Sequence, residues 1–255
     1  MARRPRFLAP ALAGAGLLAG LGCSPGPIDV ATLPSGGLLN GLVAYWPLDE
    51  GSGTLADDAS GNERNGFVAG PSWIPGQFGS ALHFSGANYM SAGSFPPATP
   101  SYSVSAWVLI QPYEVGAPIA NLVSTETPGG GWALYAMLGQ GNESYVFQFL
   151  TPGAPQGYTV SCACVVPGSW VHLVAVVDGD AATLTLYVNG VPTTVATTSA
   201  LFPGSSVLYL ARSAALSPTF PLTGALDDVA IYSRALVPQE VAALGQGPVL
   251  PAAPP

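Results

Sequence analysis

The stretch YSVSAWVLI (residues 102–110) predicts a β-strand and places the chain in an all-β class. Its apolar residues Val104, Ala106 and Val108 alternate with other residues, and a strand with one buried face needs this period of two. The stretch ATLTLYVNG (182–190) repeats the alternation and stops at Asn-Gly, a strong signal for a two-residue hairpin turn. These two runs therefore predict antiparallel strands joined by tight turns.

Further short runs of the same character lie on both sides of this stretch. We expect strands at 42–48, 81–86, 132–138, 144–150, 170–178 and 226–233. About a dozen such runs, with no long helical pattern between them, predict two packed antiparallel sheets that form a jelly-roll sandwich. One short helix is predicted at 237–245, with Pro238 in its first turn and Gly245 as its stop. We expect a single domain over 39–245 and a disordered tail over 246–255.

The composition agrees with many short strands and excludes one class of partner. The 255 residues include 32 Gly and 26 Pro, which tight turns use and helix interiors do not tolerate. Charged residues make up only 8% of the chain, and there is no Lys, so the basic surface that nucleic acids require is missing. Beyond the first six residues the chain has three Arg and fourteen acidic residues, a formal charge of −11. We therefore exclude nucleic acid as a partner and expect an acidic surface that is compatible with cation binding.

The N-terminus has the pattern of an export signal. The sequence MARRPRFLAPALAGAGLLAGLGC (1–23) joins a basic start to an apolar run that is too short for a permanent membrane span. Its LGC ending resembles a bacterial lipoprotein signal, in which the Cys is lipidated, and an ordinary secretory signal is the alternative. We predict a signal peptide over 1–22, lipidation of Cys23 and a flexible tether over 23–38 that is rich in Pro and Gly. Ser24 favours the outer membrane, so we expect an outer-membrane lipoprotein or a secreted protein, with a lipid anchor as its only membrane contact.

Five stretches resemble, in the same order, the laminin-G-like domains of the concanavalin A-like lectin/glucanase superfamily. They are LVAYWPLDEGSGTLADDASGNERNG (42–66), WIPGQFGSALHFSGANYMSAG (73–93), YSVSAWV (102–108), SWVHLVAVVDGDAATLTLYVNGV (169–191) and LTGALDDVAIYSRALVPQEVAAL (222–244). The resemblance covers about residues 40–245. It implies a jelly roll of two antiparallel sheets, with Trp107 and Trp170 on strands. The face that Trp107 takes is open.

An acidic loop and an acidic strand form the candidate metal site. Asp58 and Asn62 lie in a loop near the start, and Asp227 lies on the last strand, which in such sandwiches often neighbours the first. Hard cations such as Ca²⁺ prefer several carboxylate, amide and carbonyl oxygens, and the resemblance implies a structural calcium in this region. We predict a structural calcium held by Asp58, Asn62 and Asp227. Asp57 and Asn65 are further candidates, and the alternative is a turn held by side-chain to backbone hydrogen bonds.

The acidic residues do not form the catalytic pattern of related hydrolases. The laminarinase branch of the superfamily carries E-x-D-x-x-E on one strand, and this triplet does not occur here. Retaining hydrolysis needs two carboxyl groups about 5–5.5 Å apart. Asp178 and Asp180 have a suitable spacing, but Gly179 between them indicates a turn. His83 and His172 look like ordinary strand histidines, so we predict that the protein is not an enzyme.

Two further features leave alternatives open. Cys162 and Cys164 have a spacing that places both thiols on one face of a strand, and an unusual disulfide or two buried thiols would both fit. Aromatic residues near predicted loops and strand edges would suit either sugar stacking or the core and rim of any sandwich. They are Trp73, Tyr113, Trp132, Tyr145 and Tyr158.

The sequence favours an exported, envelope-associated recognition module that binds carbohydrate. A protein-binding or adhesion module is the alternative, and a degenerate glycoside hydrolase is the least favoured reading. The expected partner is a glycan or a cell-surface protein. This step rests on the likeness of fold, and widely used folds carry many functions.

Overall fold

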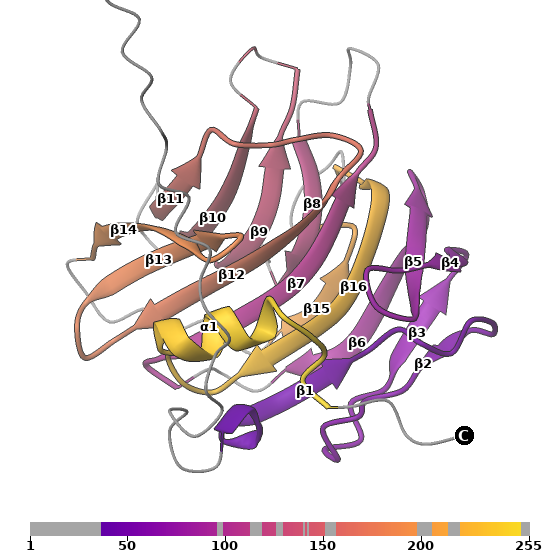
Figure 1. Cartoon of the computed structure of the whole chain (residues 1–255), viewed down its shortest axis with the longest axis horizontal. Coiled ribbons are helices and arrows are strands. Elements are labelled where there is room, and N and C mark those ends of the chain that lie inside the picture. Colours follow the sequence, from indigo (N-terminus) through magenta and orange to yellow (C-terminus); the bar gives the residue numbers. More distant parts are fainter. Residues whose placement is uncertain are drawn as a thin grey trace, which may run out of the picture.

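The computed structural model describes residues 37–95, 99–112, 119–125, 130–139, 141, 143–150, 157–197, 206–213 and 220–250. Within these residues the chain forms two antiparallel sheets of eight strands each, which lie face to face (Figure 1). The predicted all-β sandwich with one short C-terminal helix is confirmed. No helix in the described part of the chain is both long and apolar enough to cross a membrane.

The first sheet, sheet A, contains the strand predicted at residues 102–110. Its strands are, in spatial order, β14 (Val191–Ala196), β13 (Thr183–Val188), β12 (Trp170–Asp178), β7 (Tyr102–Ile110), β16 (Thr223–Tyr232), β5 (Ser80–Ser85) and β4 (Ser72–Pro75). β1 (Leu42–Trp46) also pairs with β16, beyond the stretch that pairs with β5. The predicted hairpin at Asn189-Gly190 joins β13 to β14.

The second sheet, sheet B, lies behind sheet A in Figure 1. Its strands are, in spatial order, β11 (Tyr158–Cys162), β10 (Ser144–Leu150), β9 (Gly131–Met137), β8 (Ile119–Ser124), β15 (Ser206–Leu210), β6 (Tyr89–Phe95), β3 (Gly66–Ala69) and β2 (Leu55–Ala56). A short 3₁₀ turn, η2 (Gly37–Leu39), precedes β1, and the helix α1 (Pro238–Leu244) follows β16.

The main core fills the space between the two sheets. Val104, Ala106 and Val108 of β7 point into it, as the alternation predicts, and are fully buried. From the other sheet, Leu134 of β9 and Phe147 of β10 meet them in the same cluster. Every second residue of a strand therefore contributes to one continuous apolar layer.

The outer face of sheet A carries a second, smaller core under α1. Val241 and Leu244 of the helix pack there against side chains such as Val174 of β12. Ser103 and Ser105 lie on this covered face and are buried, so β7 is buried on both faces and not only half-buried. Ser103 Oγ donates to the carbonyl of Arg234, and Ser105 Oγ lies 2.9 Å from His172 Nε2. The serines thus connect the strand to the chain that leads into the helix and to β12.

An ion pair holds the segment before α1 in place. Arg234 donates two hydrogen bonds of 2.6 Å to the carboxylate of Glu240, whose side chain is fully buried. The same guanidinium donates to the carbonyl oxygens of Gly37 and Asn40, so it ties the start of the domain to its end. A planar, two-point Arg–carboxylate pair of this kind is the strong form of the interaction.

Both ends of the described chain lie on the α1 side of sheet A. Leu38, Val249 and Leu250 pack against the second core. A disordered tail was expected from residue 246, whereas the folded part reaches Leu250. The tether predicted over 23–38 and the signal over 1–22 lie outside the described residues, apart from the last two positions of the tether.

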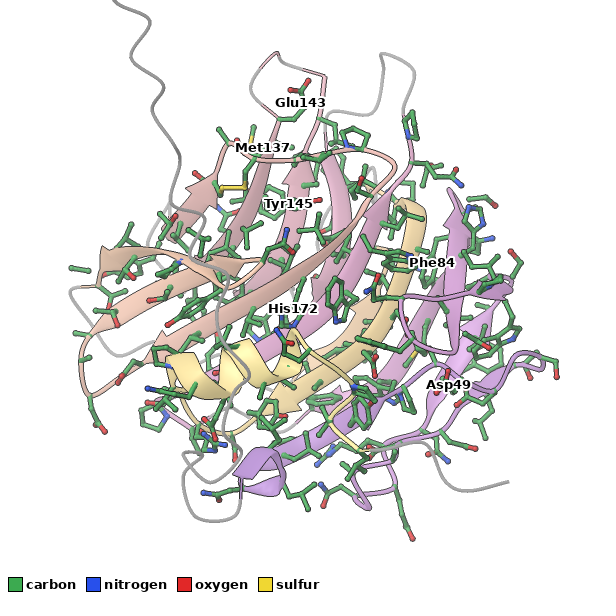
Figure 2. All side chains as sticks on the ribbon, in the orientation of Figure 1. Asp49, Phe84, Met137, Glu143, Tyr145 and His172 are labelled. Atoms are coloured by element: carbon green, nitrogen blue, oxygen red, sulfur yellow. A yellow bond between two sulfur atoms is a disulfide. The ribbon has the colours of Figure 1, made fainter. Side chains whose placement is uncertain are left out.

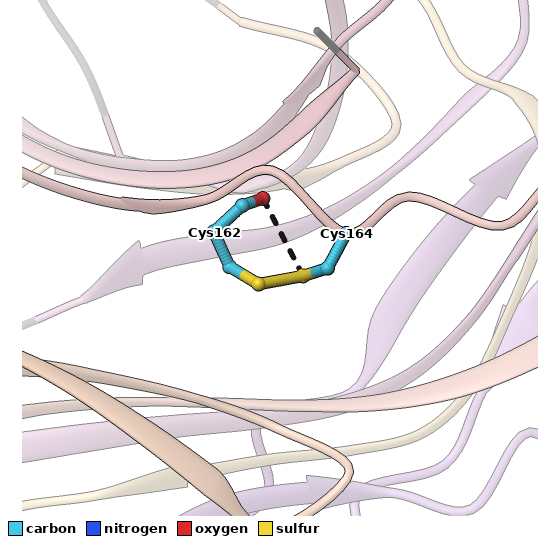
Figure 3. Close-up of a disulfide and its surroundings, with 2 residues drawn as sticks. All are labelled: Cys162 and Cys164. Atoms are coloured by element: carbon cyan, nitrogen blue, oxygen red, sulfur yellow. Dashed lines mark hydrogen bonds between the residues drawn. A yellow bond between two sulfur atoms is a disulfide. The ribbon is translucent and has the colours of Figure 1, made fainter. Parts of the chain in front are cut away.

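The two cysteines form a disulfide at the end of β11 (Figure 3). Cys162 is the last residue of the strand, and Cys164 lies beyond it, so the two are not both strand residues as expected. Their Cα atoms are 5.3 Å apart, and both side chains pack against the main core. The bridge closes a loop of only three residues and therefore restricts the unfolded chain very little.

Removing this disulfide should cost little stability. In the chain-entropy account, a loop of three residues contributes about 1.6 kcal/mol, roughly half of the value for fifteen residues. We expect the double variant C162A/C164A to unfold in urea with a free energy lower by about 1.6 kcal/mol. Phe147→Ala, which empties a fully buried site, should cost about 3–5 kcal/mol under the same conditions. A loss in the double variant as large as that of Phe147→Ala would contradict this account.

Candidate functional site

Asp58 organises the loop that precedes β3. Its Oδ1 accepts hydrogen bonds from the backbone N–H groups of Tyr45 and Ser60, both at 2.9 Å, and its Oδ2 accepts one from Arg64 N–H at 2.9 Å. Its own N–H donates to Asn65 Oδ1. Burial alone would raise the pKa of Asp58, but these donors hold it below the ordinary value. The loop is therefore held by side-chain to backbone hydrogen bonds, which was the alternative to a calcium site.

Asn62 extends the same arrangement. Its Nδ2 donates to the carbonyl oxygens of Leu42 and Val43, both at 3.1 Å. The amide thereby ties the loop to the first residues of β1.

Asp227 lies at an irregularity in β16, where the strand changes its partner from β5 to β1. Its side chain is fully buried. Oδ2 accepts the N–H of Phe78 at 3.0 Å, and Oδ1 accepts the N–H of Asp228 at 2.8 Å. A Cβ at Gly76 would lie 2.5 Å from Oδ2, so the turn before β5 can approach the carboxylate this closely only with glycine there.

Asp228 follows with a positive φ of 47° and points to a different partner. The hydroxyl of Tyr45 donates to its Oδ1, while Oδ2 is buried and has no hydrogen-bond partner among the described residues. Burial raises the pKa of Asp228 to about 6. Burial, with a further contribution from the neighbouring Asp228, raises the pKa of Asp227 to about 8. The irregularity thus places two adjacent carboxyl groups in surroundings that disfavour their charged forms.

The three predicted calcium ligands therefore lie in two separate hydrogen-bonded segments. Asp58 and Asn62 share one loop, whereas the carboxylate of Asp227 is bound to the turn at residues 76–79. Among the described residues, no hydrogen bond joins Asp227 to the loop, and no group of three His, Cys, Asp or Glu side chains is placed to hold a metal ion. The donors around each carboxylate account for both segments without a cation. Calcium binding stays a prediction.

Other acidic side chains also accept hydrogen bonds from backbone N–H groups. Asp178 Oδ1 accepts the N–H groups of Asp180 and Ala181, so the predicted turn is confirmed. Glu50 Oε1 accepts the N–H of Asp57, and Asp49 Oδ1 accepts that of Ser80. These bonds stabilise turns.

The aromatic residues singled out in the sequence are mostly structural. Trp132 and Tyr145 are buried in the main core, and Tyr158 and Trp73 pack against it. The fifth, Tyr113, lies outside the described residues.

A different set of aromatic side chains gathers on the outer face of sheet B. Leu55 of β2 pairs with Phe67 of β3, Phe67 with Ser91 of β6, and Ser91 with Tyr209 of β15. Directly paired residues of antiparallel strands point to the same face, so these four side chains form one row across the sheet. Phe67 is 56% exposed and Leu55 is 49% exposed, which leaves large apolar surface open to solvent.

Arg212 and Tyr89 complete this surface. The ring of Tyr89 meets that of Tyr209 edge-on, with centroids 5.9 Å apart. The Arg212 guanidinium carbon lies 4.4 Å from the centroid of Tyr89 and 5.0 Å from that of Tyr209. We call Phe67, Tyr89, Tyr209 and Arg212, which surround the small Ser91, the aromatic platform. An exposed apolar surface with a cation at its rim is suited to a ligand that has both a ring face and polar groups.

A hollow of about 550 Å³ lies on the opposite side of the molecule, beside α1. His172, next to the helix in Figure 2, stacks on Trp107 with ring centroids 5.1 Å apart, and both line the hollow. Burial lowers the pKa of His172 to about 4, so this ring is neutral at pH 7. None of the described residues that line the hollow carries a carboxylate. Trp107 thus faces away from the main core, which answers the question left open by the sequence.

Two comparisons with known proteins are informative: a family model shows the family, and solved structures show the fold. A laminin G family model, described as the concanavalin A-like lectin/glucanases superfamily, matches residues 84–242. Domain 4 of AbnA, an extracellular arabinanase from Geobacillus stearothermophilus solved with arabinotriose, has a TM-score of 0.57 at 22% identity. That similarity covers 80% of this chain and 98% of the arabinanase domain. No curated protein matches the sequence.

Binding domains of botulinum neurotoxin DC are similar as well. The domain solved with SialylT has a TM-score of 0.63 at 13% identity, and the domain solved with rat synaptotagmin II has 0.62 at 12%. Each similarity covers 82% of this chain and 52% of the toxin domain, so the chain matches about half the length of those domains. At these identities the solved structures show the fold alone.

The buried carboxyl groups predict a stability that falls as the pH rises. The folded state of Asp228 has a raised pKa of about 6, so it binds more protons than the unfolded chain, and its stabilising contribution is lost between about pH 4 and pH 6. Asp228→Asn can still accept from Tyr45 but stays neutral. We expect the free energy of unfolding of this variant, relative to that of the wild type, to be up to about 3 kcal/mol higher at pH 8 than at pH 4. Urea unfolding of both proteins at the two pH values measures this difference.

The comparison with the variant cancels the contribution of His172, whose pKa is lowered to about 4 by burial alone and whose stabilising effect is lost as the pH falls. Asp227 does not cancel completely, because the charge of Asp228 contributes to its raised pKa of about 8. Removing that charge lowers the pKa of Asp227, which adds to the expected gain at pH 8 with the same sign. A difference between the two proteins that is the same at pH 4 and at pH 8 would contradict the prediction.

Proposed function

Because the chain belongs to the concanavalin A-like lectin/glucanases superfamily, we propose that it is a non-catalytic carbohydrate-binding module of the bacterial cell envelope. The observation that carries the proposal is the aromatic platform on the outer face of sheet B. Aromatic faces bind the apolar side of sugar rings, and nearby polar groups bind the hydroxyl groups. Phe67 and Tyr209 lie two strands apart, about 9–10 Å, with Ser91 between them, which leaves room for adjacent sugar units.

The non-catalytic part of the proposal rests on the use of the carboxylates. Asp49, Asp58, Asp178 and Asp227 each accept backbone N–H groups and hold turns or loops. The platform itself contains no acidic residue. A similar domain of an arabinanase was solved with arabinotriose, which supports sugar as the ligand class without identifying the sugar.

A protein partner is the second candidate. Leu55 and Val207, exposed by 49% and 37%, add aliphatic surface to the same face of sheet B as Phe67. Exposed apolar patches of this kind also mark protein interfaces. A similar toxin domain was solved with rat synaptotagmin II, which supports this alternative.

We further propose that the domain is exported and held by a lipid on Cys23. This residue lies outside the described part of the chain, and the support is the sequence of residues 1–23. When the full chain is expressed with a labelled fatty acid, the wild type should carry the label in the membrane fraction. Cys23→Ser should be unlabelled, and a label that persists in this variant would exclude the proposed anchor.

The platform makes a specific prediction for sugar binding. Replacing Phe67 with Ala removes an exposed ring, so binding should weaken by about 3- to 10-fold, because one aromatic contact contributes about 0.5–1.5 kcal/mol. Val191→Ala is the matched control, since Val191 is 68% exposed on the edge of the other sheet. Binding of residues 37–250 to a glycan array, followed by titration calorimetry on the best glycan, measures both effects.

The array is read once in calcium and once in chelator, with thermal unfolding followed in both. Loss of signal or a lower Tm in chelator would support the calcium proposal, and unchanged values would exclude it. Equal weakening by Phe67→Ala and Val191→Ala would exclude the platform as the binding surface. Absence of any glycan signal from folded protein would favour a protein partner.

A further inference from the structure

Cations are scarce in the folded part of this protein, and each has a different environment. The body of the chain has only Arg64, Arg212 and Arg234. Arg234 is neutralised by Glu240, the single ion pair found among the described residues. Arg64 donates to the carbonyl oxygen of Ser94 and lies over the ring of Phe95, 5.0 Å from its centroid. Two of the three cations are therefore bonded within the fold.

Arg212 differs from both. Its guanidinium is held between Tyr89 and Tyr209, but no hydrogen bond or ion pair joins it to another described residue. Its Nε, like that of Arg64, is buried without a hydrogen-bond partner in the described part of the chain. Arg212 is of intermediate exposure, so part of the residue is accessible to a ligand. An oriented, uncompensated cation thus lies on a ring surface in a protein whose net charge is strongly negative.

We propose that Arg212 makes the aromatic platform selective for sugars that carry a carboxylate, such as uronic acids. This inference rests on the proposed function of the platform. A guanidinium presents a planar fork that matches a carboxylate with two parallel hydrogen bonds. Close contact with two tyrosine rings restricts the guanidinium, so less freedom is lost when a carboxylate binds.

The arrangement assigns separate tasks to the parts of the platform. Phe67 supplies the exposed face for a sugar ring, and the small Ser91 beside it leaves the surface accessible. Arg212 lies at the tyrosine side of this surface, where the carboxylate of the same sugar or of its neighbour would bind. Fourteen acidic residues in the chain oppose densely charged polymers at long range. Short oligosaccharides with few carboxylates should therefore bind best.

The test compares charged sugars with neutral forms of the same rings. The probes are oligosaccharides of galacturonic, glucuronic, mannuronic and guluronic acid and their methyl esters, which keep each ring and remove the charge. For the wild type, we expect at least one acid to bind ten-fold or more tightly than its ester. Arg212→Gln should reduce this ratio to near one. Arg64→Gln removes a cation that contacts Ser94 and Phe95 rather than the platform residues, and it should leave the ratio unchanged.

The remaining outcomes show whether the inference alone fails or the proposed function fails with it. If acid and ester bind the wild type equally, or if Arg212→Gln keeps the ratio, the selectivity is overturned while sugar binding stands. Binding of sulfated but not carboxylated sugars would also overturn the carboxylate assignment. If folded wild-type protein binds no sugar at all, both the inference and the proposed function fail. Near-identical Tm values for the three proteins ensure that binding is compared between folded chains.

Discussion

The arrangement of sheet A depends on one buried carboxylate, that of Asp227. β16 is the strand that joins β7 to both β5 and β1, and Asp227 lies where its partner on one side changes. By accepting the N–H groups of Phe78 and Asp228, the carboxylate satisfies backbone donors that the change of partner would leave unpaired. The same bonds bring the glycine turn before β5 onto the strand. A single side chain thus connects the first and last parts of the chain.

Strands whose sequence alternates clearly could be located from the sequence, some with their observed bounds. The stretches at 102–110, 144–150 and 170–178 are β7, β10 and β12 as predicted. β14, with the sequence VPTTVA, was not predicted because it is an exposed edge strand and lacks an apolar face. β2 has only two residues, too few for any periodic signal. Burial of both faces of β7 was also not predictable, since it depends on a helix more than a hundred residues away.

The candidate site was harder to predict than the fold. Asp58 and Asp227 were singled out as candidate ligands, but the sequence does not show that their oxygens accept hydrogen bonds from backbone N–H groups. The platform brings together Phe67, Tyr89 and Tyr209 from strands that were not predicted, and their proximity depends on pairing between distant segments. One or two aromatic residues in each of three short runs give no local signal of a shared surface. The scarcity of cations was visible in the composition, and only the structure distinguishes Arg212 from the other two.

The two outer faces of the sandwich differ, since one carries both ends of the described chain and the other carries the aromatic platform. The start and the end of the described chain pack beside α1 on the outer face of sheet A, through Leu38 and Leu250. The aromatic platform lies on the outer face of sheet B, with both sheets and the main core between. The described chain therefore begins on the face of the domain that lies opposite the aromatic platform. If the domain is held at a surface by this end of the chain, it turns its tyrosines and Arg212 outward, toward whatever approaches from the medium.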